Sequence, residues 1–207
     1  MSSKQDAELI AALRAGDRKA GQVLVERYYP KVLNFCRSKA PSAANDIAQK
    51  SFLGVFERLD KLRDPANFRG FLFGVVCNQV RMHYRRNRVE GERLDFGTVT
   101  SMDLDPSPSR IMTEKAEHRV LLEGLRRIPL EYQMVLELHY WENMRGQDIA
   151  EALDLPLGTV KTRIRRGRQL LEAAITEVEA PGQLLESTKT NLDDWARGLR
   201  KSIDTPA

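Results

Sequence analysis

The apolar residues of this chain recur at intervals of three and four, which is the spacing of one face of an α-helix. The pattern runs through residues 1–88 and again through residues 111–176. No segment alternates apolar and polar residues between turn signals, so no strand is predicted. We therefore expect an all-α fold of two small helical domains, joined by a flexible linker and followed by a helical tail.

Four helices are predicted in the first domain, residues 1–88. They cover residues 6–15, 18–39, 42–62 and 68–88. Pro30 interrupts the second helix, where a proline permits a kink. Ser42 is expected to cap the third, because a serine hydroxyl accepts hydrogen bonds from the free N–H groups of a first turn. On the buried face of this third helix we predict Ile47, Leu53, Phe56 and Leu59.

Residues 89–110 differ in character from the segments on either side. They are rich in Ser, Thr, Asp, Pro and Gly and have no helical period. Such a composition is typical of a flexible linker. The second domain, residues 111–176, begins after it, and Pro129 separates its first helix from the next, residues 131–141.

The end of the second domain has the pattern of a helix-turn-helix. A short helix ends at Asp154-Leu155-Pro156, and a second helix opens at Gly158-Thr159. One face of the second helix is apolar: Val160, Ile164, Gly167 and Leu171. The residues that point away are polar or basic: Thr159, Lys161, Thr162, Arg163, Arg165, Arg166 and Arg168. Such a helix suits the DNA major groove, although a solvated helix of an ordinary bundle has the same pattern.

The charge of the chain is modest in total but uneven along the sequence. The net charge is +4, yet residues 65–89 hold five Arg and no acid, and residues 155–171 hold five cations and no acid. Residues 90–118 sum to −4 and residues 172–207 to −3. Two basic patches separated by acidic connectors favour contact with a polyanion at two places, because phosphates attract cations. Chance clustering of Arg is the alternative.

The remaining composition argues against several classes of protein. Cys36 and Cys77 lie in apolar helical patterns without metal-ligand spacing, so we expect buried, reduced thiols and no metal. The absence of an apolar run of eighteen residues or a cleavable leader predicts a cytoplasmic protein without membrane insertion. The three His are scattered, and neither Ser51 nor Cys77 has a partner motif, so we expect no enzyme, catalytic residue or cofactor.

Several short sequence motifs are similar to those of a known family. In the first domain they are RYYPKVLNF (27–35), DIAQKSF (46–52) and FRGFLFGVVCNQ (68–79), followed by HYRRNR. In the second they are IPLEYQMVLELHYWENM (128–144), DIAEAL (148–153) and LPLGTVKTRIRRGRQLL (155–171). In this order they resemble the extracytoplasmic-function group of bacterial sigma-70 factors, over roughly residues 6–176. The resemblance implies that residues 1–88 are sigma region 2 and residues 111–176 are region 4.

The resemblance also implies partners. They are core RNA polymerase, through the clamp of its largest subunit and the flap of its second, and promoter DNA, both duplex and single-stranded. Whether an anti-sigma factor is a further partner stays open. Asp46, Gln49 and Phe52 match the helix that such factors lay against the polymerase clamp as an amphipathic docking surface. The alternative is that Asp46 and Gln49 are ordinary solvated residues.

In the first domain the resemblance implies a segment that reads the minus-ten promoter element as a single strand. The matching residues are Phe68, Arg69, Phe71 and Asn78, followed by Arg81, Arg85 and Arg86 as phosphate contacts. Aromatic and guanidinium planes stack on unpaired bases, and an amide can hydrogen-bond the edge of a flipped base. Phe68, Phe71 and Phe73 could equally be core residues, and we expect that Phe71 and Phe73 are.

In the second domain the resemblance places the minus-thirty-five contacts on the helix after the turn. Lys161, Thr162, Arg165 and Arg166 match them, and Thr159 is a further DNA-binding candidate. Long cations reach phosphates or guanine edges, and a threonine can contact a neighbouring base. Residues 128–141 are expected to pack behind this helix as a scaffold.

Some residues depart from the family pattern. Lys50 stands where the clamp-binding helix usually has an acid, and Phe71 replaces a frequent tryptophan. Gly74, Cys77 and Met82 occupy positions that are often Arg, Arg and Asp.

The alternative function is a stand-alone helix-turn-helix regulator of duplex operators. Residues 1–88 would then be a sensor or dimerisation domain. Such a sensor does not need an acid-free basic helix that ends in HYRRNR, and a receiver domain would need strands. The sigma-factor interpretation accounts for both basic patches.

The last segment, residues 177–207, lies outside the core resemblance. Its apolar residues form a stripe at helical spacing: Leu192, Trp195, Leu199 and Ile203. We predict a conditional amphipathic helix that packs on a DNA-binding domain or on a partner. A frayed terminus with a nascent helix is the alternative, because short isolated helices are marginal in water.

Overall fold

The chain folds into helices. Within the residues that the computed structural model describes, 2–86, 94–105, 116–178, 181–183 and 186, there is no strand. The elements are α1 (Ser2–Arg14), α2 (Arg18–Lys39), α3 (Ala44–Phe56), the short 3-10 helices η1 (Leu59–Lys61) and η2 (Pro65–Asn67), α4 (Phe68–Arg86), α5 (Ser101–Leu104), α6 (Ala116–Arg126), α7 (Leu130–Tyr140), α8 (Gly146–Leu153) and α9 (Leu157–Thr176). The predicted all-α class is confirmed. Over the same residues, no helix is both long and apolar enough to cross a membrane.

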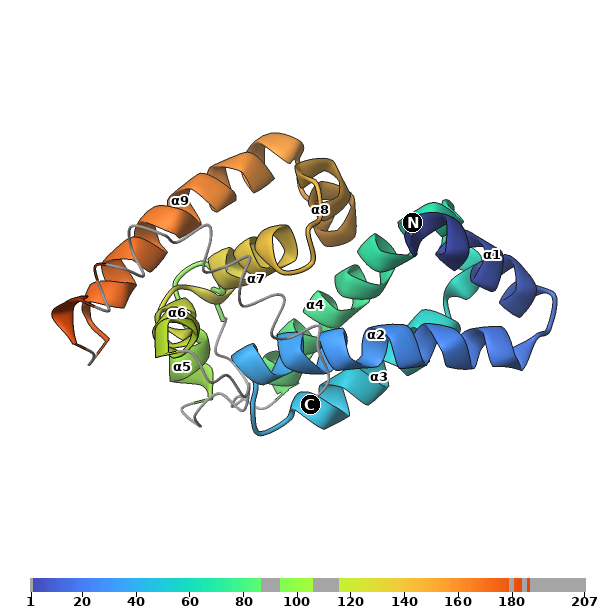
Figure 1. Cartoon of the computed structure of the whole chain (residues 1–207), viewed down its shortest axis with the longest axis horizontal. Helices are drawn as coiled ribbons and strands as arrows, with labels where there is room; N and C mark the ends of the chain where they lie inside the picture. Colours follow the sequence, from blue (N-terminus) through green and yellow to red (C-terminus); the bar gives the residue numbers. More distant parts are fainter. Residues whose placement is uncertain (1, 87–93, 106–115, 179–180, 184–185, 187–207) are drawn as a thin grey trace.

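The helices form two lobes, and α4 lies where the lobes meet (Figure 1). One lobe contains α1 to α4, and the other contains α5 to α9. Helix α4 packs against α3 within its own lobe and against α8 of the other lobe. The predicted apolar stripe of the tail, residues 192–203, lies outside the described residues.

Helix α2 is the longest element of the first lobe and follows its prediction. It begins after Asp17, whose carboxylate accepts a hydrogen bond from Lys19 N at 2.9 Å, and it continues through Pro30 to Lys39. Its inward face is apolar and buried: Leu24, Tyr28, Val32, Phe35 and Cys36. Spacing of three and four residues places these side chains on α3 and α4.

Three predictions about the third helix are wrong. Helix α3 ends at Phe56 and not at residue 62. Ser42 does not cap α3; its backbone N–H and its hydroxyl instead donate to Asp105 Oδ2, at 3.0 and 2.6 Å. Leu53 is not buried but 61% exposed. Seven residues separate Leu53 from Asp46, which is close to two helical turns, so Leu53 shares the outer face of α3 with that acid.

The second lobe contains the predicted helix-turn-helix. Helix α8 ends at Asp154, which adopts a left-handed conformation with φ 53°, and Leu155 N closes the turn on Ala150 O at 2.9 Å. Helix α9 then packs on α7. Gly167 makes this contact close, because an added Cβ would lie 3.2 Å from Leu136 Cγ. The predicted scaffold role of residues 128–141 is confirmed.

The described part of the predicted linker, residues 94–105, is folded against both lobes. Phe96 is buried, and its carbonyl accepts a hydrogen bond from Glu131 N at 3.1 Å. Thr100 and Asp103 form a capping box at α5. Asp105 binds Ser42 of the first lobe through its side chain and Arg126 of the second through its carbonyl. This stretch is therefore not a free tether, although its composition is typical of one.

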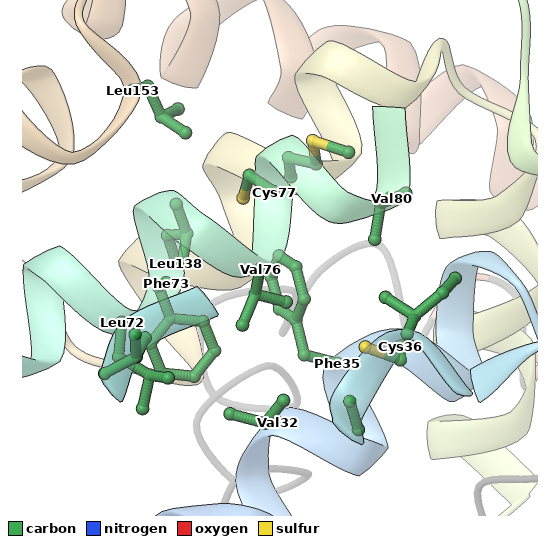
Figure 2. Packing of buried hydrophobic residues seen from close by; sticks show 14 of the residues in the cluster. Val32, Phe35, Cys36, Leu72, Phe73, Val76, Cys77, Val80, Leu138 and Leu153 are labelled. Atoms are coloured by element: carbon green, nitrogen blue, oxygen red, sulfur yellow. The ribbon is translucent and has the colours of Figure 1, made fainter. Parts of the chain in front are cut away.

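The two lobes share one hydrophobic core (Figure 2). On the side of the first lobe it contains Phe35, Phe73, Val76 and Cys77, and on the side of the second it contains Leu138 and Leu153. These residues are 9% exposed or less. Burial of this kind resembles the inside of a domain more than a transient contact between domains, because transient interfaces are more polar.

Candidate nucleic-acid interface

Helix α9 presents a basic face to solvent. The candidates Lys161, Thr162, Arg165 and Arg166 are exposed, and Thr159 is half-buried at the start of the helix. The opposite face is buried: it includes Val160, and Gly167 lies against Leu136 of the scaffold. A helix held in this way can offer the exposed side chains to a DNA groove without rearrangement.

One cation of α9 has a structural role. Arg163 forms an ion pair with Glu131 of α7, and both side chains are mostly buried. Arg166 makes only a 3.3 Å hydrogen bond to Gln169 on the exposed face. Arg163 therefore fixes α9 on its scaffold, whereas Arg166 can turn toward a phosphate or a base at little cost.

The candidates on α4 are less accessible. Asn78 is exposed and Phe71 is half-buried, and both line an open cleft of about 550 Å³ between α4 and α8. Glu151 and Ala152 of α8 form the opposite wall. Arg69 is also half-buried and lines a neighbouring cleft. The structure thus brings three of the predicted minus-ten residues, Arg69, Phe71 and Asn78, to the boundary between the lobes.

The three phenylalanines of α4 differ in position. Phe68 is fully buried and packs edge-on against Tyr28, with ring centroids 5.4 Å apart. It has no surface to offer a base, so its predicted stacking role does not fit this structure. Phe73 is buried as expected, whereas Phe71, which we expected in the core, reaches the cleft.

The basic end of α4 is partly engaged by the linker. Arg85 is exposed, and its guanidinium carbon lies 5.4 Å from the centroid of the Phe96 ring. Arg81 is half-buried and Arg86 is exposed. A cation held over an aromatic face keeps its charge available to a phosphate. Phe96 therefore lies beside one of the predicted phosphate contacts.

Helix α3 carries the predicted polymerase contacts on two different faces. Asp46 and Gln49 are exposed, and Asp46 forms an ion pair with Lys50 at 2.6 Å. Phe52 is buried and stacks on Tyr29, with centroids 6.0 Å apart, so in this structure it supports the helix from behind. Leu53 is exposed beside Asp46 and Gln49, although the apolar pattern placed it on the buried face. Its spacing from Asp46 and Gln49, seven and four residues, is the signal that places it on the exposed edge.

A buried group of polar residues, Ser38, Lys39, Gln133 and Glu137, joins the lobes, and we call it the interdomain polar cluster. Lys39 Nζ lies 2.5 Å from Glu137 Oε2, and both side chains are fully buried. Ser38 Oγ and Gln133 Nε2 also donate to this carboxylate, at 2.9 and 2.8 Å. Burial raises the pKa of Glu137 and lowers the pKa of Lys39, and the attraction between the two opposes both shifts.

The two cysteines lie in the same region as this cluster. Burial raises the pKa of the Cys36 thiol to about 12 and the pKa of the Cys77 thiol to about 11, and both also feel the charges of Lys39 and Glu137. The predicted burial of both residues is confirmed. Thiols with such pKa values are poor nucleophiles at neutral pH, so they serve as packing residues here.

Family models match both parts of the chain. The model for sigma-70 region 2 matches residues 24–90, and the model for sigma-70, region 4 matches residues 118–171. Together the two matches cover more than half of the 207 residues. The order of the matches is the order of the two lobes.

Curated relatives align over most of their length. The chain is 26% identical over 188 residues to the RNA polymerase sigma-H factor of Pseudomonas aeruginosa, which covers 84% of this chain and 96% of that protein. It is 28% identical over 181 residues to the ECF RNA polymerase sigma-E factor of Haemophilus influenzae, covering 82% and 95%. The likeness therefore extends across both lobes.

Solved structures support the fold. CnrH, in complex with the cytosolic domain of CnrY, matches with a TM-score of 0.59 and 21% identity, covering 85% of this chain and 99% of that chain. The sigma factor RpoE from Bartonella quintana, in complex with the anti-sigma factor NepR, matches with a TM-score of 0.55 and 17% identity, covering 77% and 98%. With both family models in chain order and relatives of this kind, the chain belongs to the extracytoplasmic-function group of the sigma-70 family of RNA polymerase sigma factors.

Proposed function

We propose that this chain binds core RNA polymerase, recognises the minus-thirty-five and minus-ten elements of promoters, and assists strand opening. The observation that carries the proposal is the presence of region 2 and region 4 in one chain and in this order. A stand-alone regulator would account for region 4 only. Proteins of this family are transcription initiation factors and not enzymes.

In this proposal the three exposed surfaces have separate tasks. Asp46, Gln49 and Leu53 of α3 dock on the polymerase clamp, where an apolar side chain beside polar ones makes an amphipathic surface. The basic face of α9 binds the minus-thirty-five duplex. Asn78 and the half-buried Phe71 of α4 bind the unpaired minus-ten strand, which favours opening because only the melted state offers these contacts.

An anti-sigma factor is a proposed further partner. One structural neighbour, the sigma factor RpoE from Bartonella quintana, forms a complex with the anti-sigma factor NepR, and this complex supports the proposal. Core polymerase and such an inhibitor would compete for the same chain. Adding such an inhibitor should therefore lower transcription without altering the promoter sequence that is used.

Reconstituted transcription tests the proposal. The purified chain is added to core polymerase and a library of promoter fragments, and the transcripts are sequenced. We expect promoter-specific initiation that needs both proteins, and only weak duplex binding by the chain alone, because each basic patch offers few contacts. Tight, sequence-specific binding by the chain alone, with no effect on polymerase, would instead establish the stand-alone regulator.

A further inference from the structure

Helix α1 precedes the residues that the region 2 model matches, and the proposed function gives it no task. It is nonetheless held firmly on the first lobe. Ile10 is fully buried in the core, and Asp6 accepts a hydrogen bond from Tyr28 Oη at 2.6 Å. Leu13 packs so closely on α2 that a Cβ added to Gly21 would lie 3.2 Å from Leu13 Cδ1. The end of α1 therefore has a fixed position.

The last residue of α1 reaches the segment between α3 and α4. Arg14 Nη2 donates two hydrogen bonds, to Leu59 O at 2.9 Å and to Leu62 O at 2.6 Å. Both carbonyls lie at the end of the 3-10 helix η1, and the last carbonyls of a helical turn attract a cation. Arg14 therefore completes this turn from 45 positions away along the chain. We call residues 58–63 the η1 turn.

The η1 turn forms part of the wall of the cleft that contains Phe71 and Asn78. Three cations of the turn line this cleft, Arg58, Lys61 and Arg63, and all three are exposed. Within the described part of the chain, no hydrogen bond or ion pair holds any of the three side chains. A strand whose bases reach Phe71 and Asn78 would pass its phosphates within reach of these cations.

The η1 turn has few anchors of its own. A 3-10 turn has poor hydrogen-bond geometry, and its closing bond here, from Leu62 N to Leu59 O, is long at 3.3 Å. The Leu62 side chain is buried, and Asp64 begins η2 by accepting a hydrogen bond from Ala66 N at 2.9 Å. Helix α1 also packs on η2. Without Arg14, the turn could change shape while its two ends stayed in place.

Resting on the proposed function, we propose that Arg14 is a positioning residue for the minus-ten site. It fixes the η1 turn, and the turn fixes the cations that hold the unpaired strand beside Phe71 and Asn78. Arg14 is not among the described residues that line the cleft, so it acts through the turn. Helix α1 thereby contributes to strand opening without contacting DNA.

Replacing Arg14 should slow strand opening and leave the other steps unchanged. With core polymerase and a fluorescent base in the minus-ten segment, we expect Arg14→Ala to open about five- to tenfold more slowly, because a displaced turn loses phosphate contacts. Binding to the minus-thirty-five duplex and to core polymerase should stay within about twofold, because both surfaces lie elsewhere. Arg14→Lys, which keeps a charged donor for the carbonyls, should recover most of the rate.

Arg18→Ala is the matched control for the lost charge. Arg18 is exposed at the start of α2, and its side chain has no hydrogen bond or ion pair with another described residue. We expect this variant to open promoters at the unchanged rate. An equal loss in Arg14→Ala and Arg18→Ala would mean that only net charge matters, and would overturn the positioning role.

A double-mutant cycle shows whether Arg14 acts through the η1 turn. Arg58→Gln, Lys61→Gln and Arg63→Gln together remove the cations of the turn. In this background Arg14→Ala should slow opening by less than about twofold, because residues that act through one another are not additive. The full five- to tenfold loss in this background would show that Arg14 does not act through these cations, and would overturn the proposal.

Hydrogen exchange gives a readout that does not depend on polymerase. In the free chain, Arg14→Ala should speed amide exchange in residues 57–67 and leave exchange in α2 unchanged, because local stability depends on local contacts. Unchanged exchange in residues 57–67 would contradict the positioning role. If the unaltered chain fails to open promoters with core polymerase, the proposed function is wrong. If it opens them and Arg14→Ala does so equally fast, only the role of Arg14 is wrong.

Discussion

Helices α4 and α9 are both basic and both proposed to bind DNA, yet they differ in how far their candidate DNA-binding residues are exposed. The candidate residues of α9 face solvent, and its apolar face is covered by its own scaffold, α7. Helix α4 is packed on both sides, by α3 of its own lobe and by α8 of the other. Helix α9 is therefore ready to bind DNA, whereas α4 becomes fully accessible only when the lobes separate.

This difference shows that the number of cations is a poor guide to accessibility. Residues 65–89, which include α4, and residues 155–171, which include most of α9, each hold five cations and no acid. What separates them is the partner of the apolar face. The apolar face of α9 packs within its own lobe, so its basic face is left open. Helix α4 packs against both lobes, so the face with Phe71 and Asn78 becomes one wall of the cleft between them.

The largest effect is expected from breaking the interdomain polar cluster. Glu137→Ala leaves the Lys39 ammonium buried without its partner, which should destabilise the packing between the two lobes by about 3–5 kcal/mol. The lobes can relieve this cost by separating, so the measurement is the rate of alkylation of Cys77 in a Cys36→Ala background, which should rise. The double variant Lys39→Met with Glu137→Leu removes both charges and should restore slow alkylation. Equally fast alkylation in the double variant would show that the cluster does not hold the lobes together.

The next effect separates the two helices by the step that each controls. Arg166→Ala should weaken minus-thirty-five binding by about 1–3 kcal/mol if its guanidinium contacts a base edge, and alter the preference at that base. Asn78→Ala should leave this duplex binding nearly intact and reduce strand opening, measured with a fluorescent base in the minus-ten segment. Equal losses in both steps for both variants would remove the distinction between α4 and α9.

A smaller effect is expected on polymerase affinity from the exposed edge of α3. Leu53→Ser should weaken binding to core polymerase by about 1–2 kcal/mol, because docking would remove the apolar surface of the Leu53 side chain from water. Val23→Ser is the control, since Val23 is also an exposed apolar residue, at 40%, but lies on α2. Fluorescence anisotropy of the labelled chain gives both affinities. A similar loss in the Val23 variant would argue that α3 is not the specific contact.

The smallest effect concerns the ion pair on the same helix. Lys50→Ala removes an exposed pair with Asp46, and such i,i+4 pairs contribute only about 0.3–0.5 kcal/mol. We expect the free energy of unfolding in urea to fall by no more than this amount. A loss above about 1 kcal/mol would mean that the pair supports the fold and that this face is not simply a solvated docking surface.

The sequence predicts a helix well where apolar residues recur at helical spacing and a proline or a turn marks the end of the helix. The apolar spacing and Pro41 predict α2 from Arg18 to Lys39, and the spacing of Val160, Gly167 and Leu171 predicts the buried face of α9. These features depend on neighbours within one helix or one domain. Periodicity carries that information directly.

The features that the sequence could not predict arise between segments far apart in the chain. Lys39 and Glu137 are 98 positions apart and each has an ordinary neighbourhood, so nothing local marks them as a buried pair. Phe68 fits an aromatic base-stacking pattern, yet Tyr28 covers it. Leu53 is different, because its spacing from Asp46 was available and the assignment to the buried face was wrong.

The distance between the lobes tests the central claim most directly. Fluorophores are placed on Val23→Cys and Ala173→Cys, at exposed positions of α2 and α9, and energy transfer is measured for the free chain, with core polymerase, and with polymerase and promoter DNA. We predict a single short distance in the free chain and a large increase in the promoter complex, because the two elements are roughly 85 Å apart along duplex DNA. An unchanged distance in an active promoter complex, or a free chain whose lobes are already far apart, would contradict the claim that the packed lobes separate when both promoter elements are bound.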